Sequence, residues 1–577
     1  MLRVNPTESS ILDQLRVQGI LLESPYNGKG VCGKCKVRIL RGNAGPLTET
    51  ERSFLTMEEI EQGIRLACMA VPVEPVDLDP LELLKTEHTQ VLGSSAMPAV
   101  SLQPAVTAQP VPKDREWSGN SLAETILPPE KQPALTLLRS LASLTADTEV
   151  EVVSYLGRPV DLIRRTPLWG MAVDLGTTTV SVSLVDLRTG QEVCEDGFVN
   201  PQKAFGLDVL SRIQYTLEHS TGIADLQRTI AEALQSCAER LSHQAGGSVR
   251  DIFEVSVAGN ATMIHLLLGV HPASLSQTPF RTVFRDAVTV PAAQAGLHLH
   301  PEAVLYCLPA VSAYIGGDIV AGALAERLDE REDTVFFVDI GTNGEMILCR
   351  DHKLVSCSCA AGPALEGMNI GCGMRAAQGA IEAVSLLDDR IELHTIGSGT
   401  PKGLCGSGLL DVVSQAVAKG IINKRGRIVP EHPLVCEDAN GKRQITLSSE
   451  QNISLTQGDI RQVQLCKGAI LSGCQCLLDE LKLRPEEIDH VLVAGQFGRH
   501  LSPESLVGAG LLPPAFASKI SYVGNSSRAG ATMCLLSQAE RQRAQRMARA
   551  ISYVDLSTKS GYESSFLSCM SFDLRAD

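Results

Sequence analysis

The feature that most constrains the fold is a motif that occurs twice. In "MAVDLGTTTVSVSLVDL" (171–187) and again in "VFFVDIGTNGEMILC" (335–349), an apolar run ends in Asp, a Gly-Thr turn follows, and a second apolar run begins. The motif predicts two strands joined by a tight turn. Asp174 ends the first strand in one copy, and Asp339 ends it in the other.

A second pair of segments repeats in the same order. "VSVAGNATMIHLLLG" (255–269) follows the first turn and "HVLVAGQFGRHLSPESLVG" (490–508) follows the second. Each predicts a strand that ends in V-A-G before a helix. Strands that alternate with helices are typical of α/β architectures. The repeat therefore predicts two similar halves that face each other across a cleft.

The two turns have the composition of a phosphate-binding site. A D-x-G-T turn presents backbone N–H groups and hydroxyls at its tip, with no side chain at glycine, and so forms an anion nest. Asp174 and Asp339 are predicted to hold a hydrated Mg²⁺, because that ion prefers carboxylates and water. One such turn alone is more often a plain hairpin, but the paired pattern favours nucleotide binding. The residues predicted to contact phosphate are Gly176, Thr177, Thr178 and Thr179 in the first turn and Gly341, Thr342, Asn343 and Gly344 in the second.

Two further glycines, Gly495 and Gly498, lie in "AGQFGR" at the end of the second V-A-G strand. Glycine at a strand-to-helix turn lets the backbone approach a flat adenosine, and the helix N-terminus then faces the phosphates. These two residues are therefore predicted to flank the adenosine of ATP.

Several longer segments carry a resemblance to known proteins. The turns and the V-A-G strand are similar to those of the actin, sugar kinase and heat-shock-70 ATPase superfamily. More specifically, the chain from about residue 171 to about residue 540 resembles the reductive activators of corrinoid proteins. The segments that carry this resemblance are "NPQKAFGLDVLSRIQY" (200–215), "VAGNATMIHLLLG" (257–269), "YIGGDIVAGAL" (314–324), "AAGPALEGMNIGCGM" (360–374), "CGSGLLDVV" (405–413), "GDIRQVQLCKGAI" (458–470) and "YVGNSSRAGA" (522–531).

The resemblance implies a domain order. Members of this family carry an N-terminal plant-type ferredoxin domain, a linker, a middle domain and the ATPase. We therefore expect a multi-domain protein with a β-grasp ferredoxin-like (α+β) domain at 1–80 and a Pro-rich linker with a small linker segment at 81–165. A duplicated α/β actin-like (ribonuclease H-like) ATPase fold follows, with its first half, the middle domain, at 166–330 and its second half at 331–577. Residues 93–121 show no helical or strand period and predict a semi-extended linker.

Three cysteines in the N-terminal segment match an iron-sulfur loop. Cys32 and Cys35 lie in the glycine-rich stretch "PYNGKGVCGKC", and Cys68 lies in "IRLACMA". In the plant-type ferredoxins that this segment resembles, a C-x5-C-x2-C loop supplies three ligands and a later "LAC" segment supplies the fourth. The resemblance places Cys32, Cys35 and Cys68 at the second, third and fourth positions, and Tyr26 at the first.

Three interpretations of the Tyr26 position remain open. A 2Fe-2S cluster assembles with the Tyr26 phenolate, water or a nearby thiol in the shell, or the domain has lost its cluster, or the sequence carries a local error. We favour a bound but atypical or labile cluster, because a folded metal-free loop rarely needs so many glycines. The other cysteines, including the pairs Cys357/Cys359 and Cys474/Cys476, are predicted to pack in apolar surroundings.

Four other polar residues lie in the segments that carry the resemblance. Asp208 in "FGLDVLSRI" and Asp318 in "GGDIVAG" could orient an attacking water, and a helix cap or turn is at least as good an explanation of each. His265 lies among apolar neighbours and is predicted to be a core histidine. Glu366 lies in a glycine-rich loop, where contact with the nucleotide or with the corrinoid partner is left open.

Composition limits the remaining choices. The net charge of -15 argues against a nucleic-acid surface as the main function, since phosphate backbones require clustered Lys and Arg. The sequence shows no signal peptide and no long apolar span, which predicts a cytoplasmic protein without membrane contact. Its 17 cysteines are scattered along the chain, which does not suggest a disulfide framework.

The resemblance implies an ATP-hydrolysing reductive activase. It would return an oxidised Co(II) corrinoid to Co(I) for a methyltransferase system, with ATP driving the uphill electron transfer and the ferredoxin-like domain relaying the electron. The implied cofactors are ATP, Mg²⁺ and a 2Fe-2S cluster, and the implied partners are a corrinoid protein and an electron donor protein, with a homodimer left open. Two alternatives remain: a nucleotide-gated factor that remodels a corrinoid protein without its own cluster, and a small-molecule kinase on the same fold.

Overall fold

The computed structural model describes most of the chain. The described residues are 2–18, 20, 22, 28–30, 33–80, 97–111, 121–127, 132–144, 149–164, 166–387, 390–438, 441–495 and 501–573. They fall into two compact units, one within 1–91, 101–307 and 535–538, and the other within 92–100, 308–534 and 539–577.

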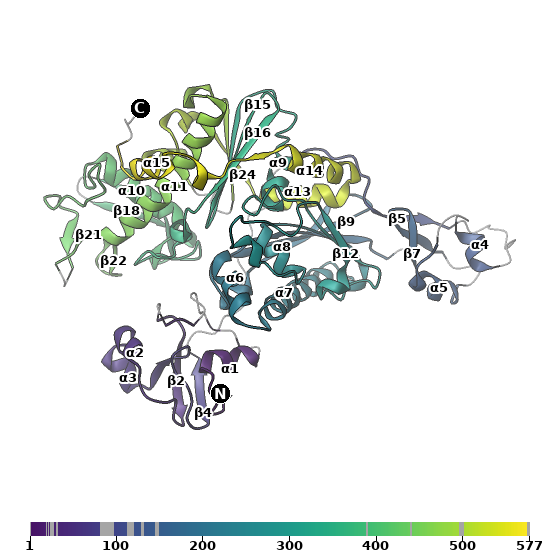
Figure 1. Ribbon diagram of the computed structural model, residues 1–577, viewed down its shortest axis with the longest axis horizontal. Coiled ribbons are helices and arrows are strands. Elements are labelled where there is room, and N and C mark those ends of the chain that lie inside the picture. The colour runs from purple at the N-terminus through teal and green to yellow at the C-terminus, as the bar shows by residue number, and fades with distance from the viewer. Residues whose placement is uncertain are drawn as a thin grey trace. The chain divides into compact units, whose positions relative to one another are not determined.

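The N-terminal domain is a small α+β unit. Its strands form one sheet in the order β1-β4-β2-β3, and every pairing in it is antiparallel. Figure 1 shows α1 beside strands β2 and β4, and the apolar side chains of Leu12 and Leu15 on that helix are fully buried in the domain core. The elements are β1 (Leu2–Val4), α1 (Ile11–Val17), β2 (Lys36–Arg41), α2 (Glu49–Phe54), α3 (Met57–Glu61), β3 (Ile64–Leu66) and β4 (Val76–Pro80).

The segment that follows contains more structure than the sequence predicted. We expected an extended linker over residues 93–121, but Val106–Pro110 forms strand β5, which pairs antiparallel with β6 (Glu151–Tyr155). The sheet continues to β7 (Arg158–Ile163) and carries helices α4 (Leu122–Ile126) and α5 (Leu135–Leu141). The expectation was wrong because residues 93–121 as a whole show no period that predicts a strand. The strand β5 is stabilised by its pairing with β6, more than forty residues later in the chain.

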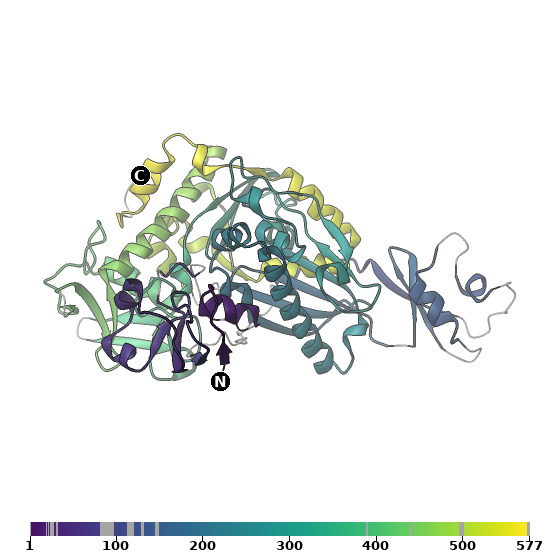
Figure 2. The same cartoon turned by 60° about the horizontal axis from the view of Figure 1, so that its bottom comes forward.

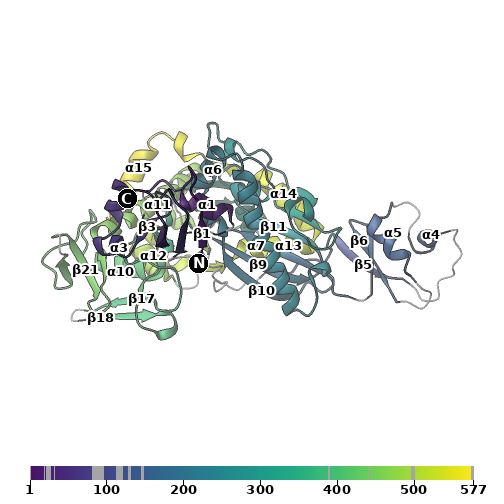
Figure 3. The same ribbon diagram turned by 90° about the horizontal axis from the view of Figure 1, so that it is seen from below.

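The first half of the ATPase fold is a six-stranded sheet in the order β10-β9-β8-β11-β13-β12. Helix α7 buries Leu226, Ile230, Leu234 and Leu241, whose spacing of four or seven residues places them on one face. Figure 3 shows this helix lying along the sheet. The elements are β8 (Trp169–Leu175), β9 (Thr179–Asp186), β10 (Glu192–Val199), α6 (Val209–Glu218), α7 (Gly222–Gln244), β11 (Ile252–Gly259), α8 (Ala261–Leu267), β12 (Val288–Pro291) and β13 (Val304–Cys307).

The second half is built on a sheet in the order β24-β23-β14-β15-β16-β25. Its elements are α9 (Gly317–Ala325), β14 (Val335–Ile340), β15 (Gly344–Arg350), β16 (Lys353–Cys359), α11 (Gln457–Leu481), β23 (His490–Ala494), α12 (Pro503–Gly508), β24 (Ile520–Gly524), α13 (Ser526–Leu536), α14 (Gln538–Ala550), β25 (Ser552–Tyr553) and α15 (Tyr562–Cys569). In Figure 2 the C-terminal helix α15, in yellow, lies beside the long helix α11.

Two small sheets and one further helix extend this second half. The sheets have the orders β18-β17-β19 and β20-β21-β22. The elements are β17 (Ala380–Leu386), β18 (Ile391–Thr395), β19 (Gly403–Leu404), α10 (Gly406–Ala418), β20 (Val435–Glu437), β21 (Arg443–Ser448) and β22 (Ile453–Thr456).

The predicted repeat is confirmed strand by strand. In each half the first strand, β8 or β14, pairs antiparallel with the strand after the turn and parallel with the V-A-G strand. The register is also the same, since Asp174 is opposite Ala258 and Asp339 is opposite Ala494. Each sheet therefore brings its turn and its V-A-G strand to the same edge, as the sequence predicted.

A buried network holds the turn of the first half from behind. Asn200 donates its backbone N–H to the Thr178 carbonyl oxygen at 2.8 Å and its side-chain amide to that of Gly176 at 2.9 Å. Arg212 on α6 is fully buried and donates Nη2 to the Thr177 carbonyl oxygen at 2.6 Å and Nε to the Gly206 carbonyl oxygen at 2.9 Å. The backbone carbonyls of Gly176, Thr177 and Thr178 are thus occupied on the protein side, and the Gly176 N–H closes the turn itself, which leaves the N–H groups of Thr177 and Thr178 for a ligand.

We expect Arg212→Met to loosen this turn. The substitution keeps most of the side-chain volume but leaves buried carbonyl oxygens without a donor, which should lower the free energy of unfolding of the first half by about 3 kcal/mol. Hydrogen exchange of residues 174–180 should become faster. Arg228→Met on exposed α7 is the matched control and should change stability by less than about 0.5 kcal/mol. Unchanged exchange in the turn would contradict the role given to Arg212.

Candidate functional site

The glycine that ends each V-A-G strand lies against the Asp-bearing strand. A Cβ atom on Gly259 would lie 2.9 Å from the Leu175 carbonyl oxygen, and one on Gly495 would lie 2.9 Å from the Ile340 carbonyl oxygen. Gly495 also has φ of +100° and would bring a Cβ within 2.8 Å of Asp339 Oδ1. Only glycine fits at this close approach, so the structure brings the predicted residues Gly495 and Asp339 together. Gly498 lies outside the described residues.

The first turn offers hydroxyl and backbone donors. Gly176, Thr177, Thr178 and Thr179 are all partly exposed, and the turn closes by a 3.1 Å hydrogen bond from the Gly176 N–H to the Thr179 carbonyl oxygen. Asn260, which caps helix α8, donates Nδ2 to Thr177 Oγ1 at 3.0 Å. Because Thr177 accepts this bond, its own hydroxyl proton stays available to donate to a phosphate oxygen.

The second turn differs in chemistry although its backbone is similar. The Gly341 N–H donates to the Asn343 carbonyl oxygen at 2.9 Å. The sequence predicted that the Thr342 hydroxyl donates to a phosphate. In this structure the hydroxyl donates to Glu366 Oε1, a protein carboxylate oxygen. Gly344 is buried at the start of β15, where a Cβ would lie 2.9 Å from Cys359 Sγ. Its absent side chain serves packing, and its predicted contact with the nucleotide stays a prediction.

Carboxylates gather around the second turn. Glu345 lies opposite Asp339 in the β14–β15 register, and Ser358 Oγ is 3.4 Å from its Oε1. Burial raises the pKa of Glu345 well above its ordinary value, and the charges of Asp318 and Asp339 raise it further. The raised pKa favours the protonated form of Glu345, which reduces repulsion between these neighbouring acids.

No group of three or more His, Cys, Asp or Glu side chains within the described part of the chain is arranged as a metal site. A hydrated Mg²⁺ at a nucleotide uses one or two carboxylates with water and phosphate oxygens. Asp174 and Asp339 are each partly exposed at the end of a strand. Either carboxylate alone would meet that requirement. Their Mg²⁺ role stays a prediction.

The structure gives structural roles to two residues that the sequence left open. Asp208 caps helix α6, where its Oδ1 accepts from the Ser211 N–H at 2.8 Å in a capping box. We therefore do not retain Asp208 as a catalytic residue. Asp318 lies in the first turn of α9 and its Oδ1 accepts from the Ile319 N–H at 2.9 Å.

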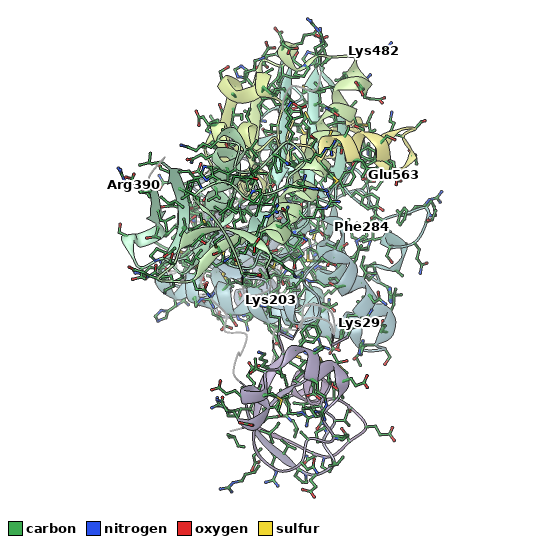
Figure 4. All side chains as sticks on the ribbon, turned by 90° about the vertical axis from the view of Figure 1, so that its left-hand side faces the viewer. Lys29, Lys203, Phe284, Arg390, Lys482 and Glu563 are labelled. Carbon is green, nitrogen blue, oxygen red and sulfur yellow. The ribbon has the colours of Figure 1, made fainter. Side chains whose placement is uncertain are left out.

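His265 is a core histidine, as predicted. It is fully buried, its Nδ1 lies 2.6 Å from the Ala261 carbonyl oxygen, and its Nε2 accepts from the Val283 N–H at 3.2 Å. Its ring stacks on Phe284, labelled in Figure 4, with centroids 4.6 Å apart. Burial lowers the pKa of His265, so it is neutral at pH 7.

Two of the predicted cluster ligands meet in the N-terminal domain. The sulfur atoms of Cys35 and Cys68 are 3.2 Å apart, although 33 positions separate them in sequence. Hydrogen bonding with Cys68 lowers the pKa of Cys35 to about 7 against the effect of burial, and backbone hydrogen bonds lower it further. Paired sulfurs, a lowered thiol pKa and nearby amide donors are what an iron-sulfur cluster needs from its protein, so these two residues fit the group. Cys32 and Tyr26 lie outside the described residues.

The surroundings of the two sulfurs are fixed by glycines and by a buried ion pair. Gly28, Gly30 and Gly33 all have positive φ, between 66° and 77°, as a loop that folds around a ligand requires. Glu51 is fully buried and accepts from Arg65 Nε at 2.7 Å and from the Leu66 N–H at 3.1 Å, just before the Cys68 segment.

The sequence analysis missed one cation near the cysteines. Arg16 on α1 is buried, and burial lowers its pKa, while the charges of Cys35 and Cys68 are among those that favour its protonated form. A fixed positive charge near thiolates stabilises their negative charge. As predicted, Cys357, Cys359 and Cys474 are buried, and every cysteine among the described residues is a free thiol.

Three known family models match the sequence, and together they cover most of the chain. Residues 333–575 match the family described as the C-terminal domain of RACo, the ASKHA domain. Residues 169–331 match the RACo middle region, and residues 1–73 match the 2Fe-2S iron-sulfur cluster binding domain. No helix among the described residues is long and apolar enough to span a membrane.

Individual relatives agree with these matches. The corrinoid activation enzyme RamQ of Eubacterium limosum is 28% identical over 589 residues, which cover 96% of this chain and 94% of that protein. The [Co(II) methylated amine-specific corrinoid protein] reductase of Methanosarcina barkeri is 25% identical over 393 residues, covering 63% of this chain and 69% of that protein.

A solved structure of a reductive activator for corrinoid,iron-sulfur protein superimposes with a TM-score of 0.73 and 32% identity, over 98% of this chain and 96% of that one. The predicted combination of a ferredoxin-like domain with an actin-like ATPase fold is thereby confirmed. The chain belongs to the RACo family, with a 2Fe-2S binding domain at its N-terminus and an ASKHA domain at its C-terminus.

Proposed function

We propose that this protein is an ATP-dependent reductive activator of corrinoid proteins, which returns Co(II) to Co(I) by one-electron transfer. The observation that carries the proposal is that one chain has both a candidate iron-sulfur site and a candidate nucleotide site. The N-terminal domain pairs Cys35 with Cys68 at 3.2 Å, and the ATPase fold repeats the D-x-G-T turn in equivalent registers. The relatives named as a corrinoid activation enzyme and a corrinoid protein reductase support the same activity.

Each turn is assigned a part in nucleotide binding. In the first, Thr177, Thr178 and the backbone N–H groups bind phosphate oxygens, while Asn200 and Arg212 hold the turn from behind. In the second, Asp339 would hold Mg²⁺, and Gly495, which has no side chain to clash with the Asp339 carboxylate, would flank the adenosine. Asp174 takes the equivalent metal-binding role in the first half.

Cys32, Cys35 and Cys68 are the residues that would hold the cluster, whose chemistry is the carriage of one electron at a time. The chain's own contribution is to bury the Cys35 sulfur and to direct amide donors toward it. A separate protein must supply the electron, because no part of the proposed reaction generates one.

Reduction of Co(II) to Co(I) is uphill for ordinary donors, so ATP must alter the energetics. A nucleotide can do so only if it favours one conformation of the activator and that conformation binds one cobalt state better than the other. The linkage is reciprocal, so the corrinoid protein must in turn change the affinity of the activator for ATP.

One observation favours a second function. Tyr26 stands at the first ligand position, so a chain that has lost its cluster would act as a nucleotide-gated remodelling factor for the corrinoid protein. In that case another reductase would deliver the electron. A small-molecule kinase on the same fold would leave the 2Fe-2S binding domain at the N-terminus without a function.

Iron and sulfide analysis of the anaerobically purified protein separates these two functions. We expect about two irons and two sulfides per chain, with the visible spectrum of a 2Fe-2S cluster. Tyr26→Cys should increase the stability of the cluster toward air, because it restores a fourth thiolate. A colourless wild-type protein beside a brown Tyr26→Cys variant would support the remodelling factor.

Asp339→Ala tests the metal assignment. Loss of the carboxylate should lower ATP-dependent Co(I) formation and ATP hydrolysis by about 100-fold or more, because the charge of the bound metal is then no longer held at the phosphates. The iron content should not change. Asp479→Ala on the exposed face of α11 is the control and should hydrolyse ATP like the wild type. Hydrolysis retained in Asp339→Ala would refute the assignment.

A further inference from the structure

We propose that Glu366 is a catalytic residue of the ATPase and that its carboxylate accepts a hydrogen bond from the water that attacks the γ-phosphate. This inference rests on the proposed function, since it assumes that ATP binds at the second turn. It assigns the water-orienting role to a residue whose part the sequence left open.

The backbone fixes the position of Glu366. The residue ends a short 3-10 helix (Pro363–Glu366) between Gly362, with φ of +76°, and Gly367, with φ of +75°. A Cβ on Gly367 would lie 2.3 Å from the Met374 carbonyl oxygen, so a larger residue there would have to displace the backbone. Two left-handed glycines thus direct this one carboxylate toward the turn.

One oxygen of the carboxylate is anchored on the phosphate turn. Thr342, three residues after Asp339, donates its hydroxyl to Glu366 Oε1. The bond also orients Thr342, because the hydroxyl proton faces Glu366 and the lone pairs of Thr342 Oγ1 face away from it. Those lone pairs are suited to a metal ion or to a bound water.

The other oxygen has no hydrogen-bonding partner within the described residues. Glu366 Oε2 is buried, and a buried carboxylate oxygen without a donor is costly. The missing donor must therefore be a ligand that arrives at the second turn. A phosphate oxygen cannot serve, since it is also an acceptor and is negatively charged, whereas water can donate.

The other acids near the turn are less suited to this role. Asp208 is the N-cap of α6 in the other half. Glu345 lies opposite Asp339 in the β14–β15 register, and its Oε1 already has a protein donor in Ser358 Oγ at 3.4 Å. Asp318 Oδ1 accepts a hydrogen bond from the Ile319 N–H at the start of α9. Glu366 alone among these combines an anchor on the turn with a buried oxygen that needs a donor.

The reaction balances with this single residue. The water oxygen forms a bond to the γ-phosphorus while the bond from that phosphorus to the β–γ bridging oxygen breaks, and the bridging electron pair leaves with ADP. The water proton passes to Glu366 and then to inorganic phosphate or to solvent. A positioned general base typically contributes about 10²- to 10⁴-fold to the rate.

Glu366→Gln in the full-length protein is the decisive variant. The amide oxygen can still accept from Thr342, but an amide NH₂ replaces the acceptor Oε2, so the fold should be retained and the function lost. We expect kcat for ATP hydrolysis to fall by about 100-fold or more. The Kd of Mg²⁺ with the non-hydrolysable analogue AMPPNP, measured by titration calorimetry, should stay within threefold. Glu392→Gln, on the exposed edge strand β18, is the matched control and should leave both quantities unchanged.

Each other outcome overturns the inference. A kcat within threefold of wild type would show that Glu366 does not act on the water. A Kd for Mg²⁺-AMPPNP that rises tenfold or more together with the fall in kcat would make Glu366 a ligand of a metal-bound water instead. Wild-type protein that fails to bind Mg²⁺-AMPPNP would refute the proposed function itself, which separates that failure from the failure of Glu366.

Discussion

The nucleotide chemistry of the first half depends on one buried cation. Arg212 is fully buried, and its guanidinium donates to the carbonyl of Thr177 inside the phosphate turn. A buried charge interacts more strongly with a nearby anion than an exposed one, because little water screens it. The same side chain therefore fixes the shape of the turn and makes its surroundings favourable for phosphate.

The second half has the same topology with the opposite electrostatics. Its turn lies beside Asp339 and Glu366, and its hydroxyl is bonded to the carboxylate of Glu366. Negative charge favours a metal ion and bound water over phosphate. The duplicated fold thus carries two chemically different turns, which explains how similar halves can take different parts in ATP hydrolysis.

The sequence predicted the features that are local and missed those that depend on distant contacts. The strand-turn-strand repeat and the positions of Asp174 and Asp339 follow from apolar runs and turn residues, and the structure confirms them. Arg212 could not be recognised, because an Arg four residues after Asp208 on an amphipathic helix looks like an ordinary surface pair. Its partner Thr177 is 35 positions away, and Glu366 is 24 positions from Thr342. For Asp208 the sequence offered a helix cap and a water-orienting acid as alternatives, because both have the same local sequence, and the structure shows the cap.

The distance between the Cys35 and Cys68 sulfur atoms indicates how these two residues could share an iron. Two thiolates on one tetrahedral metal with bonds of about 2.3 Å lie about 3.8 Å apart. Cys35 and Cys68, at 3.2 Å, are close enough to bind the same iron. The iron that these two cysteines would hold keeps both thiolates whichever residue stands at the first ligand position. A phenolate oxygen is a harder ligand than a thiolate and favours the ferric state. Ligation by Tyr26 would therefore lower the reduction potential, which is the direction that reduction of Co(II) to Co(I) requires.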